Sequence, residues 1–186
     1  GSGDALTSGS NCTALGYEAL STMTTSSHST AVGSHCMQDN TGEMNTAVGS
    51  ASMKENQTGA YNTAIGFQSL QVNTGSHYNT AVGYNALQDN VAHNNTAVGM
   101  TAGLNITTGT QNVAIGSTAF QSATTASQCV AIGYDALGDS NNAYSTAVGD
   151  QAAAKNYNSN TVAVGYAALG QNTTGSSNTV VGSAAA

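Results

Sequence analysis

The sequence predicts an all-β fold: a parallel β-solenoid of eleven coils, each 16–17 residues long, in a single repeat domain that spans residues 1–186. The first observation is a nine-residue stretch, Asn79-Thr80-Ala81-Val82-Gly83-Tyr84-Asn85-Ala86-Leu87, which recurs along the whole chain. The second is the near-constant spacing of its glycine, which returns at Gly16, Gly33, Gly49, Gly66, Gly83, Gly99, Gly116, Gly133, Gly149, Gly165 and Gly182. The third is the alternation of polar and apolar residues before each glycine, which is typical of a short strand.

The composition suits a hydrogen-bonded stack better than a globule with a bulky core. Only 6% of the residues are charged, 39% are hydrophobic, and the net charge is −7. Disordered chains combine low hydrophobicity with high charge, which this chain lacks. Two Lys and Arg residues in total are too few to follow a phosphate backbone, so we expect no nucleic-acid partner. No apolar run reaches the roughly 20 residues that span a bilayer, so we expect no membrane insertion.

The strand is predicted over the three residues before each glycine, where residues two apart share a face. The residue directly before the glycine is always aliphatic, and we expect it to form the core. This predicted core column contains Val32, Val48, Ile65, Val82, Val98, Ile115, Ile132, Val148 and Val164. The residue three before the glycine is Thr or Val, and we expect it on the same face, partly buried, with its hydroxyl near the rim.

Between these two positions stands an alanine, on the opposite face of the predicted strand. A solvent-facing position would vary in size and polarity from copy to copy, whereas this one stays alanine until Val180. We therefore expect it to pack against identical chains around a long axis, and three chains satisfy this arrangement. The subunit-interface candidates are Ala31, Ala47, Ala64, Ala81, Ala97, Ala114, Ala131, Ala147 and Ala163.

The segment after the glycine returns the chain to the next strand. It carries a small residue and then usually an apolar one, as in Ala86-Leu87, so we place it opposite the predicted core column in a thin two-layer roll. The rest of the connection is rich in turn-forming Asn, Thr and Gly. We interpret Cys12, Cys36 and Cys129 as small apolar substitutes. An asparagine four before the glycine predicts a hydrogen-bonded side-chain ladder in six copies: Asn45, Asn62, Asn79, Asn95, Asn112 and Asn178.

Three stretches, Asn62 to Gly66, Asn112 to Gly116 and Cys129 to Gly133, resemble the repeat of YadA-type trimeric autotransporter adhesin heads. The longer form, Asn-Thr-Ala-Val-Gly-Tyr-x-Ala-Leu, is similar to repeats in phage and bacterial tail-fibre-domain proteins. The resemblance covers nearly the whole chain and implies a left-handed parallel β-roll, a homotrimer and a surface-exposed fibre. The period here is longer than in the adhesins, which predicts a protruding extra turn. Neither end resembles a cap, so we expect a segment of a longer fibre.

No catalytic constellation is visible, because the histidines and carboxylates are scattered without a nucleophile elbow, phosphate loop or zinc spacing. We therefore expect no enzyme, no cofactor and no metal site. His77 and His93 occupy the same position in adjacent copies; in a trimer they could form stacked rings that hold a metal or an anion, and the alternative is exposed loop histidines. Tyr61, Tyr78 and Tyr144 stand five before the glycine and are candidates for contact with a glycan.

These features predict a structural and adhesive fibre segment, an adhesin head or a tail-fibre shaft, that presents loops to a cell surface or receptor. We expect its partners to be copies of itself and a host-surface glycan or protein, in an extracellular, cell-surface or virion location. A purely structural extracellular filament without its own receptor is the alternative, and the short connections favour it. An ice-binding solenoid is a third possibility, since flat Thr/Ala arrays can order water, although the threonines are expected to face inward.

Overall fold

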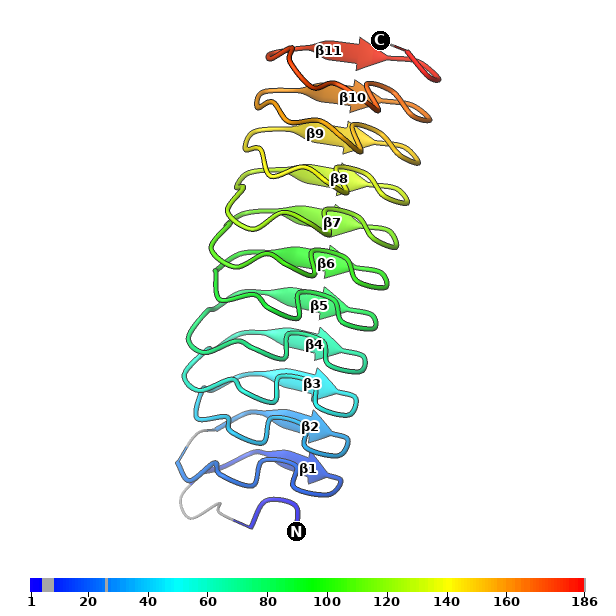
Figure 1. Cartoon of the computed structure of the whole chain (residues 1–186). Coiled ribbons are helices and arrows are strands. Elements are labelled where there is room, and N and C mark those ends of the chain that lie inside the picture. Colours follow the sequence, from blue (N-terminus) through cyan, green and yellow to red (C-terminus); the bar gives the residue numbers. More distant parts are fainter. Residues whose placement is uncertain (5–8, 26, 186) are drawn as a thin grey trace.

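The computed structural model describes residues 1–186 except 5–8, 26 and 186, and it is an all-β parallel solenoid (Figure 1). Eleven three-residue strands stack in chain order into one parallel sheet, one strand per predicted repeat. The predicted fold class is therefore confirmed at this level. No described residue lies in a helix, so none forms a helix that could cross a membrane. The strands are β1 (Thr13–Leu15), β2 (Thr30–Val32), β3 (Thr46–Val48), β4 (Thr63–Ile65), β5 (Thr80–Val82), β6 (Thr96–Val98), β7 (Val113–Ile115), β8 (Val130–Ile132), β9 (Thr146–Val148), β10 (Val162–Val164) and β11 (Thr179–Val181).

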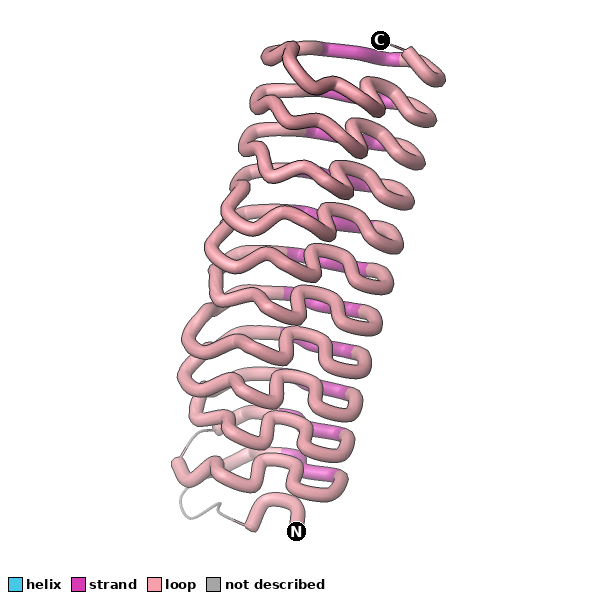
Figure 2. The backbone as a smooth tube through the Cα atoms, viewed as in Figure 1, coloured by secondary structure: helices cyan, strands magenta, loops and turns pink. Residues whose placement is uncertain are grey.

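All neighbouring strands share one register, which aligns equivalent residues of successive repeats, as in the pairing of Ala64 with Ala81. Figure 2 shows that strand is confined to one side of each coil and that turns form the rest. The hydrogen-bonded ladder continues into these turns, where Leu87 N–H donates to the Ala102 carbonyl at 3.0 Å. The longer and the shorter form of the repeat keep the same register, so the extra residue is accommodated in the connection.

The side chains of each strand alternate between two faces, as predicted. The face that is buried, however, is the one that was predicted to point away from the core. The alanines point into the solenoid and are inaccessible or nearly so in a single chain, as are Ala31, Ala47, Ala64, Ala81, Ala97, Ala114, Ala131, Ala147 and Ala163. The predicted core column points outward instead, and its residues are exposed or half-buried: Val32, Val48, Ile65, Val82, Val98, Ile115, Ile132, Val148 and Val164. The predicted core and the predicted subunit interface are therefore both wrong.

The reason for the reversal is the small distance between the strands and the turn layer, which we define as the residues two to six after each glycine. Side chains of the turn layer reach the strand backbone directly, since Ser52 Oγ donates to the Ala64 carbonyl at 3.1 Å. Only a methyl group fits on the strand side of so thin a core. The larger apolar side chains come from the turn layer and are fully buried: Leu20, Met37, Met53, Leu70, Leu87, Phe120 and Leu137.

The glycine that ends each strand allows neighbouring coils to approach closely. Gly83 has a φ of 138°, and a Cβ atom built on it would lie 2.4 Å from the carbonyl oxygen of Gly99 in the next coil. No side chain fits there without separating the backbones. Two further left-handed residues follow, Asn85 (φ 53°) and Leu87 (φ 50°), and the chain thereby turns Leu87 into the core. Such a conformation is uncommon for leucine.

The predicted asparagine column is hydrogen-bonded, but its bonds join side chains to the backbone of the next coil rather than to one another, at Asn45, Asn62, Asn79, Asn95 and Asn112. Asn79 Oδ1 accepts a hydrogen bond from Asn95 N–H at 2.8 Å, and Asn79 Nδ2 donates to the Ala92 carbonyl at 2.9 Å. A second buried column lies seven after the glycine, where Asn73 Nδ2 donates to Asn56 Oδ1 at 2.7 Å. Because buried polar groups are costly without partners, these asparagines are structural.

The three cysteines take places in these internal columns and form no disulfide among the described residues. Cys129 continues the asparagine ladder, since its N–H donates to Asn112 Oδ1 at 3.0 Å. Cys36 is fully buried, and this burial raises the pKa of its thiol to about 12. Buried thiols of this kind act as small apolar residues rather than as reactive groups.

Candidate functional site

The outward side chains of the eleven strands form a continuous surface, which we call the strand face. Each strand contributes a Thr or Val at its first position and a Val, Ile or Leu at its last, so the strand face carries no charge. Its aliphatic residues are accessible: Ile65 is 41% exposed and Val98 is 37% exposed. A long, uncharged, partly apolar face is unusual for a surface that meets only water.

In six of the eleven coils a large side chain borders the strand face at the position directly after the glycine, while the other coils carry serine or, at Asp150, aspartate. These large side chains are exposed, and Phe67 stacks on Tyr84 with ring centroids 5.6 Å apart. We call them the bulky row: Tyr17, Phe67, Tyr84, Met100, Tyr134 and Tyr166. Since the bulky row follows the aliphatic end of the strands, it widens the apolar surface of the strand face on that side.

The tyrosine candidates divide into a stacked pair and a separate residue. Tyr61 and Tyr78 stack with ring centroids 5.1 Å apart and an interplanar angle of 14°, and both are exposed. Each ring therefore covers one face of the other, and a sugar ring could stack only on the faces that remain. Tyr144 is exposed too, but it lies in a different coil, away from this pair. The structure thus brings Tyr61 and Tyr78 together and leaves Tyr144 apart from them.

The histidine candidates also stack, with the rings of His77 and His93 5.2 Å apart. Nδ1 of His77 accepts the Ala60 N–H at 2.9 Å, and Nδ1 of His93 accepts the His77 N–H at 3.0 Å. Both rings therefore carry their hydrogen on Nε2 and offer a donor rather than a metal-binding lone pair at that atom. No group of three or more His, Cys, Asp or Glu among the described residues could hold a metal ion.

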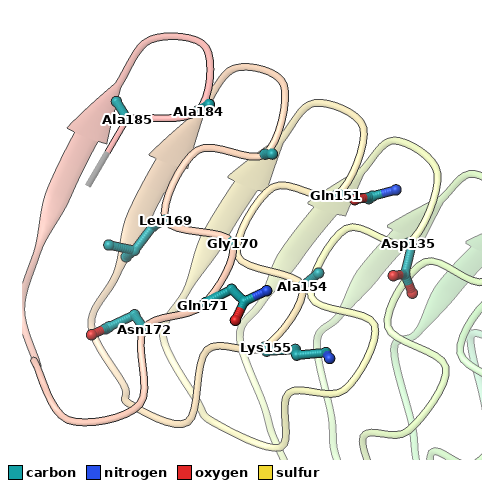
Figure 3. Close-up of a pocket in the computed structure, with 11 residues that line it drawn as sticks. Asp135, Gln151, Ala154, Lys155, Leu169, Gly170, Gln171, Asn172, Ala184 and Ala185 are labelled. Carbon is teal, nitrogen blue, oxygen red and sulfur yellow. The ribbon is translucent and has the colours of Figure 1, made fainter.

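The turn layer contains a hollow of about 510 Å³ that sequence reasoning missed (Figure 3). Figure 3 shows Lys155 and Gln171 along one side, Gln151 along the other, and Ala154 between them. Asp135 also lines the hollow. Burial raises the pKa of the Asp135 carboxyl, and the neighbouring Asp139 and Asp150 raise it further, while the Lys155 ammonium lowers it.

A sequence signal for this hollow exists in the residue five after the glycine. In most coils this residue has a long side chain, but three successive coils carry Gly138, Ala154 and Gly170. Aligning the repeats on their shared residues does not reveal this loss of a long side chain, because the position five after the glycine varies between coils.

No protein-family model matches the chain, and neither a curated protein nor a solved structure matches it. The features of the molecule that bear on function are therefore the strand face, the stacked Tyr and His pairs, and the hollow.

Proposed function

We propose that this chain is a segment of a homotrimeric fibre in which the strand faces of three copies, each a left-handed roll, pack around a common axis. The observation that supports this proposal is the strand face itself, an uncharged and partly apolar surface along the whole stack. The resemblance of the repeat to trimeric adhesin heads supports the number three. We therefore still propose self-association, but we assign the interface to the outward Val and Ile residues instead of the buried alanines.

The size of the strand face indicates that the bulky row takes part in the contact. Eleven strands at about 4.8 Å and three residues at about 3.3 Å make a face of roughly 500 Å². A standard interface buries about 800 Å² on each partner, so the strands alone fall short. Exposed members of the bulky row, such as Tyr84 and Phe67, supply further apolar area beside the strands.

The fibre serves attachment, as an adhesin head or a tail-fibre shaft in an extracellular, cell-surface or virion location. A bundle of three parallel rolls presents each turn three times, so weak contacts with a cell surface add by multivalency. The stacked pairs Tyr61 with Tyr78 and His77 with His93 are accessible for such contacts. A purely structural filament is the alternative if no surface of the trimer binds a receptor.

Ice binding is a second candidate because the threonines of the strand face point outward, contrary to the inward orientation predicted from the sequence. Thr30, Thr63 and Thr80 are half-buried on this face, beside Val or Ile methyl groups at regular strand spacing. A strand face that packs inside a trimer cannot also bind ice. A monomer with thermal hysteresis would support ice binding, and a trimer without it would support the fibre.

The deciding experiment is the solution mass by light scattering for the native chain and for Val82→Asp. We expect the native chain to show three times its single-chain mass of 18.4 kDa, and the variant to dissociate because its charge lies in the strand face. Thr74→Asp, in an exposed turn, is the matched control and should leave the trimer intact. A native chain that stays monomeric at high concentration would refute the proposed trimer.

A further inference from the structure

The hollow in the turn layer arises from a local departure from the repeat. Five after the glycine, the first coil carries Ser21, and the next six coils carry Gln38, Lys54, Gln71, Gln88, Leu104 and Gln121. Such side chains bridge neighbouring coils: Gln38 Nε2 donates to Glu18 Oε2 at 2.9 Å, and Gln88 Nε2 donates to Gln71 Oε1 at 3.1 Å. Ala154 and Gly170 have no side chain that could do so, and both residues line the hollow.

The open space is lined by charges of both signs. Lys155 is one of only two lysines and arginines in the protein, and it forms no ion pair with any described carboxylate. Asp135 also lines the hollow, and the carboxylates of Asp139 and Asp150 are close enough to act on it electrostatically. The three carboxylates would repel an anion, and the Lys155 ammonium group reduces their attraction for a cation.

The remaining lining groups suit a neutral ligand rich in hydroxyl groups. Gln151 and Gln171 contribute side-chain amides, which both donate and accept hydrogen bonds. A hydroxyl group can likewise donate to a carboxylate and accept from an ammonium group. Ala154, Ala167 and Ala184 contribute methyl groups on which the C–H face of a sugar ring can lie.

We propose that this hollow binds a neutral saccharide of one or two rings, with Asp135 and Lys155 as hydrogen-bonding partners of its hydroxyl groups. A volume of about 510 Å³ lies within the range of about 300–1,000 Å³ that is typical of small-molecule sites. The inference rests on the attachment part of the proposed function and deepens it, because it names a ligand class. It does not depend on self-association, since the hollow belongs to the turn layer and the strand face belongs to the opposite layer (Figures 1 and 3).

The test is saturation-transfer NMR with the intact chain and a panel of neutral monosaccharides and disaccharides, each at about 10 mM, a concentration that detects millimolar affinity. Ala154→Gln introduces a glutamine, which several other coils carry at the equivalent position. The substitution therefore fills the hollow with a side chain that the repeat accommodates elsewhere. Lys155→Gln removes the charge and keeps an amide. Lys54→Gln, the other lysine in the turn layer, is the matched control.

We expect at least one neutral saccharide to bind, with affinity reduced at least about tenfold by Ala154→Gln and by Lys155→Gln and unchanged by Lys54→Gln. The proposal is overturned if no neutral saccharide binds, if only charged sugars bind, or if Ala154→Gln binds as well as the native chain. Light scattering on the same samples separates the two proposals: a monomer that binds a saccharide refutes the trimer and leaves this site standing.

Discussion

Replacing Asn79 by alanine tests whether the internal ladder holds the coils together. Asn79 is 1% exposed, and its side chain satisfies two backbone groups of the next coil, the N–H of Asn95 and the carbonyl of Ala92. Alanine leaves the Asn95 N–H buried without its partner, whereas the Ala92 carbonyl still accepts a hydrogen bond from Asn90 Nδ2 at 2.8 Å. An unsatisfied buried group costs about 1–3 kcal/mol, so we expect a loss of roughly 1–3 kcal/mol in the free energy of unfolding. This is an appreciable part of the roughly 5–15 kcal/mol that is usual for a folded domain.

Asn79→Ser provides a graded comparison, because serine occurs naturally in this column. Ser145 Oγ accepts the Thr161 N–H at 3.4 Å, so serine replaces the hydrogen bond to the N–H at a longer distance, and we expect about half the loss. Gln57→Ala, in an exposed turn, is the control.

Urea unfolding followed by circular dichroism measures the global effect. Amide hydrogen exchange at Asn95 measures the local one, since repeat stacks can unfold in parts. If Asn79→Ala unfolds at the same urea concentration as the control and Asn95 stays protected, the ladder does not stabilise the stack.

Three further substitutions or reactions test other parts of the structure. Gly83→Ala should prevent close stacking, because its Cβ would lie 2.4 Å from the Gly99 carbonyl oxygen, and a native-like melting temperature would contradict this. The pKa of Asp135 is raised above its ordinary 3.8, so the fold favours its protonated form and loses stability as the pH rises through that raised pKa. Asp135→Asn should therefore stabilise the chain at pH 7 and have no effect near pH 3; equal effects at both pH values would refute the argument. At pH 8 a thiol reagent should modify half-buried Cys12 well before buried Cys36, and equal rates would show that the core opens.

The regular alternation of each repeat predicted strands, period and in-phase stacking, and all three are found. These properties are local, because they depend on side chains two apart in a strand and on a repeat of almost constant length. The asparagine column four before the glycine was predictable for the same reason, since a polar residue kept at one position of a stack has equivalent residues above and below it.

The orientation of the faces could not be derived from one repeat. Val82 is larger and more apolar than Ala81, so its burial was the natural expectation, but apolar residues also occupy much of a protein surface. The distance between the strands and the turn layer decides the matter, and that distance depends on Leu87 and Ala86 of the facing turn as much as on the strand. In the same way, the hollow depends on neighbouring coils together, because Ala154 and Gly170 line one space only when their coils are stacked.

The sequence by itself therefore determined the repeat, the parallel stack and the lack of charge on the strands. Only the tertiary structure decided which face is inside, which histidine nitrogen carries the hydrogen, and where a ligand could enter. The physical reason is that periodicity constrains backbone hydrogen bonding within and between coils, whereas burial depends on the thickness of the core, which is set by contacts between segments that are distant within each repeat.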